Sequence, residues 1–140
     1  GGHIGFSPVL PQDGTKALEQ FRRAYARYQE YGMDYQGSFA FGERHLLNVN
    51  AMIFDKDSPE MMAKIDPFFR TLVADAKANG YGEYRTHLDY MDLVRDTYDW
   101  NGGSLWNLNR TVKDALDPNG ILAPGKSGIW PSATNGGQPA

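Results

Sequence analysis

The stretch LLNVNAMIF at residues 46–54 interleaves apolar side chains with Asn48 and Asn50, and this period of two is typical of a half-buried β-strand. The segment before it, residues 34–41, is rich in aromatic side chains and alternates more weakly. A turn at residues 42–44, which read GER, would let the two segments pair. The sequence therefore predicts a β-hairpin in this part of the chain.

Amphipathic helices are predicted on both sides of the hairpin. Over residues 15–31, apolar side chains recur every three or four positions with charges between them. Residues 58–80 form a second helical pattern with Pro59 in its first turn, and Pro67 is expected to kink or divide this helix. With a short apolar strand over residues 3–9, the order is β-α-β-β-α, which predicts a two-layer α+β unit.

The character of the sequence changes after Gly80. Helical patterns over residues 88–98 and 104–116 flank a turn at residues 101–103, and an irregular segment rich in proline and glycine follows them. We therefore expect three parts, which are residues 1–80 with the α+β unit, residues 81–131 with the helical segment, and a flexible tail at residues 132–140.

Composition excludes several classes of function. The chain has 140 residues, 41% of them hydrophobic and 22% charged, which suits one packed globular domain. It has no cysteine, and its three histidines lie far apart, so no metal centre is predicted. A net charge of -3 and dispersed basic residues argue against nucleic acid and anionic membranes as partners. No run of about twenty apolar residues is present to cross a membrane.

Residues 80–87, which read GYGEYRTH, bring a phenol, a guanidinium, a carboxylate and an imidazole together just before a predicted helix. Adjacent Tyr84 and Arg85 could form part of a functional site. Alternatively, the tyrosine ring packs on the core and Arg85 pairs with Glu83. The residues alone leave both interpretations open.

Residues 117–128, which read DPNGILAPGKSG, contain two prolines and three glycines around Lys126. These residues fix an irregular backbone, which suits a site that holds an ammonium group against a fixed acceptor. The segment could equally be a rigid C-terminal strap whose lysine faces water. Neither interpretation is favoured by the residues themselves.

Together with GHIGFSP at residues 2–8, these two segments closely resemble the vanillyl-alcohol oxidase and eugenol oxidase family of flavoenzymes, which oxidise 4-substituted phenols. Three motifs at these separations are far more specific than any one of them. The likeness extends to Pro131 but corresponds to about the last quarter of a family enzyme. It implies that residues 1–80 are the C-terminal half of a substrate-binding cap domain, and that residues 81–131 pack near the flavin.

The resemblance also implies partners that this chain lacks. The N-terminal flavin-binding domain and the first half of the cap domain would supply an acidic base and a second phenolate-binding tyrosine. The chain is therefore not expected to be active alone. The full enzyme is expected to be a cytoplasmic homo-oligomer that transfers a hydride from the phenolic substrate to FAD, with molecular oxygen as acceptor and hydrogen peroxide as product. The alternatives are a cytochrome-coupled phenol methylhydroxylase and a non-catalytic cap or interaction module.

Site residues follow from the same resemblance. It implies that His3 bonds FAD covalently, that Tyr84 and Arg85 bind the phenolic oxygen with Arg85 also beside the cofactor, and that Lys126 lies near the pyrimidine edge of the flavin. A guanidinium and a phenolic O–H favour a bound phenolate over a neutral phenol, which gives these assignments a physical basis. The expected lining of the substrate cavity is Gly5, Ser7, Tyr35, Ser38, Leu47, Val49 and Glu83.

Overall fold

The computed structural model describes residues 1–134, and the chain forms two compact units. The first unit spans Gly1–His87 and the second begins at Leu88. The flexible tail expected at residues 132–140 lies outside the described residues from position 135 onward. Its described start is tied to the second unit, because the Ser132 backbone N–H and hydroxyl bond the Asp114 carboxylate at 2.7 and 2.5 Å.

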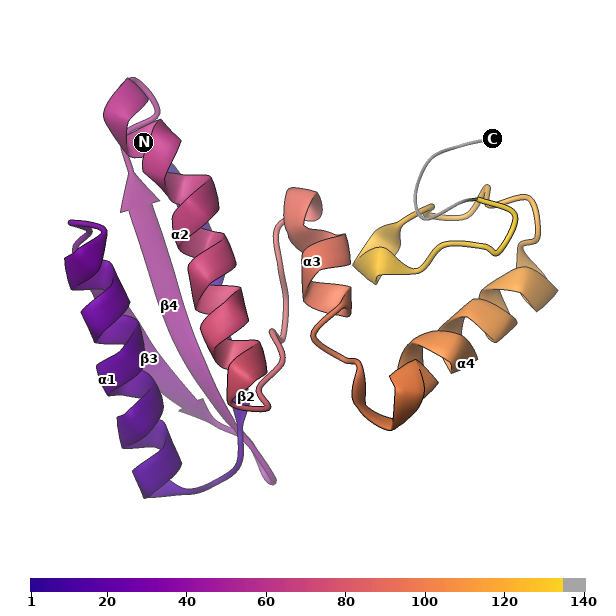
Figure 1. Cartoon of the computed structure of the whole chain (residues 1–140), viewed down its shortest axis with the longest axis horizontal. Helices are drawn as coiled ribbons and strands as arrows, with labels where there is room; N and C mark the ends of the chain where they lie inside the picture. Colours follow the sequence, from indigo (N-terminus) through magenta and orange to yellow (C-terminus); the bar gives the residue numbers. More distant parts are fainter. Residues whose placement is uncertain (135–140) are drawn as a thin grey trace. The chain divides into compact units, whose positions relative to one another are not determined.

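The first unit is a two-layer α+β fold with β4 as its central strand. The hairpin partner β3 pairs antiparallel along one edge of β4, while β1 and β2 share the other edge. Helices α1 and α2 lie side by side against the sheet (Figure 1). The predicted β-α-β-β-α order is confirmed. The elements are β1 (Gly2–Phe6), β2 (Val9–Leu10), α1 (Gly14–Glu30), β3 (Gln36–Phe41), β4 (Leu46–Phe54) and α2 (Pro59–Ala78).

The two faces of β4 have different surroundings. The even-numbered residues are all buried toward the helices, and Gln20 of α1 donates to Asn48 across this layer at 3.4 Å. The core of this layer includes Phe68, Phe69 and Tyr28, which are fully buried. The odd-numbered row remains partly or fully exposed on the opposite side, which we call the open face. That row consists of Leu47, Val49, Ala51 and Ile53.

Helix α2 starts where the sequence predicts, with the hydroxyl of Ser58 accepting the N–H of Met61 at 3.3 Å. It is continuous through Pro67, so the expected division of the helix does not occur. Pro67 cannot donate to the carbonyl of Ala63, four residues earlier. Both residues are exposed, so water can reach this part of the helix and satisfy that carbonyl.

The described part of the second unit contains one longer helical element, Trp100–Leu116, together with shorter helical segments and tight turns. The helix expected over residues 88–98 is shorter than predicted, because regular α-helix ends at Arg95 and single-turn hydrogen bonds close the next three residues. Residues 101–103 are not helical, although they fall within the bounds of the element Trp100–Leu116, and they form the predicted turn. Their left-handed φ values of 52°, 63° and 73° are ones that asparagine and glycine adopt at low cost. The elements are η1 (Leu88–Tyr90), α3 (Met91–Arg95), α4 (Trp100–Leu116) and η2 (Lys126–Gly128).

Candidate functional site

The edge of the sheet is interrupted between β1 and β2, at Ser7 and Pro8. Proline has no N–H for a β-ladder. Ser7 directs both of its backbone polar groups away from β4, donating its N–H to Oε1 of Glu83 at 2.8 Å and accepting the N–H of Tyr84 at 2.9 Å. The single strand expected over residues 3–9 is therefore two strands, and the break between them becomes a docking point for residues 82–84.

A short antiparallel ladder completes this attachment. The N–H of Val9 donates to the carbonyl of Gly82 at 2.9 Å, and Pro8 forms a β-bridge with Glu83. These bonds place residues 81–87 in the first unit, although their sequence grouped them with the helical segment. Consequently, Tyr84 and Arg85 lie beside the end of β1.

Within this segment, burial changes sharply between Glu83 and Tyr84. Glu83 is only 3% exposed, and burial raises the pKa of its carboxyl to about 8, although the N–H of Ser7 acts in the opposite direction. Tyr84 is 61% exposed, so its ring does not pack on the core, and Arg85 is exposed as well. The ladder thus presents a phenolic hydroxyl and a guanidinium together at the surface of the unit.

Five of the predicted site residues lie on the open face. Leu47 and Val49 belong to its exposed row on β4. Ser38 pairs directly with Val49, and Gly5 and His3 pair with the next two members of that row. Because directly paired residues share one face of an antiparallel sheet, all five positions project to the same side. The structure therefore brings together residues from three strands.

Tyr35 is placed differently. Its ring packs edge-on against Phe21, Tyr25 and Tyr28 of α1, with ring centroids 5.4, 5.7 and 5.1 Å apart. Burial also raises the pKa of its hydroxyl, partly offset by a hydrogen bond with Asn48. The structure therefore groups Tyr35 with the helix-covered layer and not with the open face.

Sequence reasoning missed Asn50 as a residue that supports the site. Its amide nitrogen donates to the carbonyl of Phe6 at 3.2 Å, next to the break in the edge strand. Asn50 is 1% exposed and also donates to the side chain of Asn48 at 2.9 Å. The signal available in the sequence is the pair of asparagines at alternating positions of an otherwise apolar strand.

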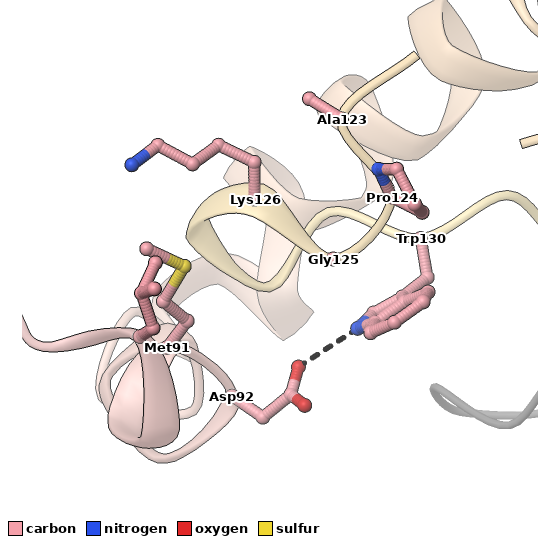
Figure 2. Close-up of a pocket in the computed structure, with 8 residues that line it drawn as sticks. Met91, Asp92, Ala123, Pro124, Gly125, Lys126 and Trp130 are labelled. Atoms are coloured by element: carbon pink, nitrogen blue, oxygen red, sulfur yellow. Dashed lines mark hydrogen bonds between the residues drawn. The ribbon is translucent and has the colours of Figure 1, made fainter. Parts of the chain in front are cut away.

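Lys126 lies at the start of η2 in the second unit, where it borders an open pocket of about 340 Å³. Figure 2 shows its side chain extending away from the hydrogen bond between Trp130 and Asp92, which measures 3.0 Å. The ammonium group is exposed, which is compatible with both interpretations of this segment. The lining residues are Leu88, Met91, Asp92, Ala123, Pro124, Gly125, Lys126 and Trp130.

A buried carboxylate makes the segment before Lys126 rigid. Asp117 accepts the backbone N–H groups of Ile121 and Leu122 at 2.9 and 2.8 Å and the ammonium of Lys113 at 2.6 Å. The lysine ammonium is the main cause that lowers the pKa of Asp117. The irregular backbone, which the prolines and glycines predict, thus also depends on the hydrogen bonds of Asp117. The spacing of the prolines and glycines does not reveal these bonds.

Comparison with known proteins identifies the chain. Residues 12–127 match the family described as FAD linked oxidases, C-terminal domain. The chain belongs to this family. The match takes in both helices of the first unit, its β3–β4 hairpin and most of the second unit, and it confirms the resemblance drawn from the three motifs. Membership also implies FAD as the cofactor.

The relatives of this FAD-linked oxidase domain are named for phenols. It is 33% identical over 129 residues to the flavoprotein subunit of 4-cresol dehydrogenase (hydroxylating) from Pseudomonas putida, covering 92% of this chain and 24% of the relative. It is 35% identical to 4-ethylphenol oxidase from Gulosibacter chungangensis, solved as its isoeugenol complex, with a TM-score of 0.88 and coverage of 94% and 25%. For p-cresol methylhydroxylase with substrate bound, the identity is 32%, the TM-score 0.85 and the coverage 92% and 24%. The chain thus spans about a quarter of the length of these relatives.

Each unit of the FAD-linked oxidase domain, taken by itself, carries exposed groups of a kind that can contact a flavin. In the first unit, His3 carries an exposed imidazole on the open face and Arg85 an exposed guanidinium. In the second unit, Lys126 carries an exposed ammonium group. The backbone at Gly5 is also accessible, because a Cβ added there would meet only the carbonyl oxygen of Asn50, at 4.0 Å. None of the helices among residues 1–134 is both long and apolar enough to cross a membrane.

Proposed function

We propose that this chain is the C-terminal part of a flavin-dependent oxidase that acts on para-substituted phenols of the vanillyl alcohol or eugenol type. The observation that carries the proposal is the ladder to Ser7, which holds Tyr84 and Arg85 beside the edge of the open face. The relatives are named for 4-ethylphenol and p-cresol, and these names support the same substrate class. The remaining three quarters of the enzyme would come from segments outside this chain.

Arg85 and Tyr84 would bind the phenolic oxygen of the substrate. A free phenol has a pKa of about 10, and each unit by which a site lowers it requires about 1.4 kcal/mol of preferential binding to the anion. A guanidinium stays protonated at any working pH, and the hydroxyl of Tyr84 donates a second hydrogen bond. Together they favour the phenolate, whose charge promotes loss of hydride from the para carbon.

The open face would receive the body of the substrate. Val49 and Leu47 offer apolar contact to an aromatic ring, and the small Gly5 and Ser38 leave room for ring substituents. FAD, when bound, would supply the hydride acceptor and, in an oxidase, the route for electrons to oxygen. His3 would hold FAD covalently, and Lys126 would offset negative charge near its pyrimidine edge.

The choice of electron acceptor tests the proposal. We expect the full-length flavoprotein, given 4-ethylphenol in air, to consume oxygen and release hydrogen peroxide in equal amounts. The measurement is an oxygen electrode combined with a peroxidase assay. The control is the same protein given 4-ethylanisole, whose methylated oxygen cannot ionise, and we expect no turnover.

The second candidate is a methylhydroxylase that passes electrons to a cytochrome. It is favoured by the identity to 4-cresol dehydrogenase, 33%, which nearly equals the 35% to the oxidase. Reduced flavin that reacts slowly with oxygen but rapidly with an added cytochrome c would support this candidate and contradict the oxidase. If neither 4-ethylphenol nor p-cresol reduced the flavin, the protein would be neither this oxidase nor this methylhydroxylase.

The covalent link to His3 has its own test. Acid-precipitated wild-type protein is expected to keep its yellow colour, because a covalent bond survives denaturation. The His3→Ala variant should release its flavin into the supernatant, as measured by absorbance. His45→Ala, which changes an exposed histidine in the β3–β4 turn, serves as the matched control and should retain the colour. Retention of flavin by denatured His3→Ala protein would contradict the assignment.

A further inference from the structure

We propose that Glu83 is a positioning residue, whose buried carboxyl fixes Tyr84 and Arg85 against the end of β1 in the orientation that phenol binding requires. The inference rests on the proposed function and extends it to a residue that does not itself touch the substrate. It follows from the contacts that Glu83 and Tyr84 make with the same residue, Ser7.

Ser7 is held from two directions by adjacent residues. The side chain of Glu83 accepts its N–H at 2.8 Å, and the backbone of Tyr84 donates to its carbonyl at 2.9 Å. A residue bonded at both backbone groups cannot turn relative to its partner segment without breaking one of them. The path of the chain into Arg85 is therefore set by this pair of bonds.

Beyond the ladder, the chain has no regular structure before η1 begins at Leu88. The side chains of Tyr84 and Arg85 are exposed, so packing of their own does not hold them in this unit. Glu83, which directly precedes these two residues, is buried with 3% of its surface exposed, and the segment's other buried residue, Tyr81, lies three positions before Tyr84. Glu83 is therefore the side chain through which the fold can fix the two residues that follow it.

The contact at Ser7 requires an acceptor and does not require a charge. Burial raises the pKa of Glu83 to about 8, so near pH 7 the neutral acid predominates. A neutral carboxyl still accepts the N–H of Ser7 through its carbonyl oxygen. Glutamine has nearly the same shape and offers the same acceptor, whereas alanine and leucine offer none. This difference separates positioning from a role that depends on charge.

The test uses the full-length flavin-loaded protein with Glu83→Ala, Glu83→Leu and Glu83→Gln variants. Glu83→Leu keeps the buried volume filled, so it guards against a collapse caused by an empty cavity alone. Glu43→Ala, at an exposed glutamate of the β3–β4 turn, is the matched control. The readouts are flavin content, kcat and KM for 4-ethylphenol, and the difference spectrum of bound isoeugenol, which separates phenol from phenolate.

We expect kcat/KM to fall about 100-fold in the alanine and leucine variants, because misplacement of a binding group by roughly 1 Å has an effect of that size. Their bound isoeugenol should show less phenolate, with flavin content unchanged. Glu83→Gln should remain within about threefold of wild type, since it keeps the hydrogen bond. Glu43→Ala should match wild type in every readout.

Several results would overturn the inference. One is a Glu83→Ala or Glu83→Leu protein with wild-type kcat/KM, and another is a Glu83→Gln protein as impaired as Glu83→Ala. Loss of flavin or of the folded state in both apolar variants would show a purely structural role instead. A wild-type protein that neither oxidises 4-ethylphenol nor binds isoeugenol would contradict the proposed function itself, which distinguishes the two failures.

Discussion

Replacing Arg85 with alanine in the full-length protein is expected to lower kcat/KM for 4-ethylphenol by about 10²–10³-fold, the usual effect of removing one preorganised donor from a developing or bound oxyanion. The reason is that the variant binds the neutral phenol, which is a poor hydride donor at its para carbon. Anaerobic stopped-flow measurement of flavin reduction reports this step directly. Flavin content should be unchanged, because FAD would keep its other contacts.

The pH profile should show the cause of the Arg85→Ala defect. Near pH 10 the substrate ionises in solution without help, so the gap between the variant and the wild type should narrow as the pH rises. Arg85→Lys should have an intermediate activity, because lysine keeps the charge but not the planar pair of donors. Arg44→Ala, at an exposed arginine of the β3–β4 turn, is the matched control. Unchanged turnover in Arg85→Ala would favour a non-catalytic cap module.

Replacing Phe68 with alanine is expected to lower the local free energy of unfolding of the first unit by about 3–5 kcal/mol. Phe68 is fully buried, meets Tyr28 edge-on with ring centroids 4.8 Å apart, and stacks on Tyr31 at the same separation. Its removal would leave a cavity between α1 and α2 that rigid neighbours cannot refill. Native-state hydrogen exchange of amides in β4 and α2 of the full-length protein measures this effect without requiring global two-state unfolding.

The control for Phe68→Ala is the same substitution at Phe41, the last residue of β3, which is 80% exposed. We expect Phe41→Ala to change the same free energy by less than about 0.5 kcal/mol, as for most surface substitutions. Equal effects at the two positions would mean that the contacts between α1 and α2 do not stabilise the unit as described.

The sequence predicts the hairpin and both long helices well, because their hydrophobic periods are local. It is less informative about which row of β4 is buried. Hydrophobicity alone would bury Val49 and its neighbours and expose Asn48 and Asn50, yet the asparagines lie under the helices. They are tolerated there because they bond one another and the carbonyls of adjacent strands. Such a network involves residues far apart in the sequence, so no local pattern reveals it.

The candidate site shows the same division between local and non-local information. Resemblance singled out Tyr84 and Arg85, but not the contact that holds them, since a ladder of three residues has no detectable period. Likewise, the helix predicted over residues 88–98 has its regular α-helical part end at Arg95, and the hydrogen bonds that close the following residues are not visible in the periodic pattern. At the ladder, tertiary hydrogen bonds, and not the intrinsic preferences of the residues, decide the backbone path.

The arrangement of the sheet has a consequence for the assembly of the whole protein. Within residues 1–134, β3 is bonded to β4 alone, so the backbone groups along its outer side remain available for strand addition. The uncovered apolar row of β4 lies beside it on the same sheet. An additional strand from elsewhere in the polypeptide could therefore pair with β3 and widen the sheet. Such a strand would also extend the open face, which is proposed to receive the substrate. The same unpaired edge of β3 would make this chain, when produced by itself, prone to aggregate through strand pairing between copies.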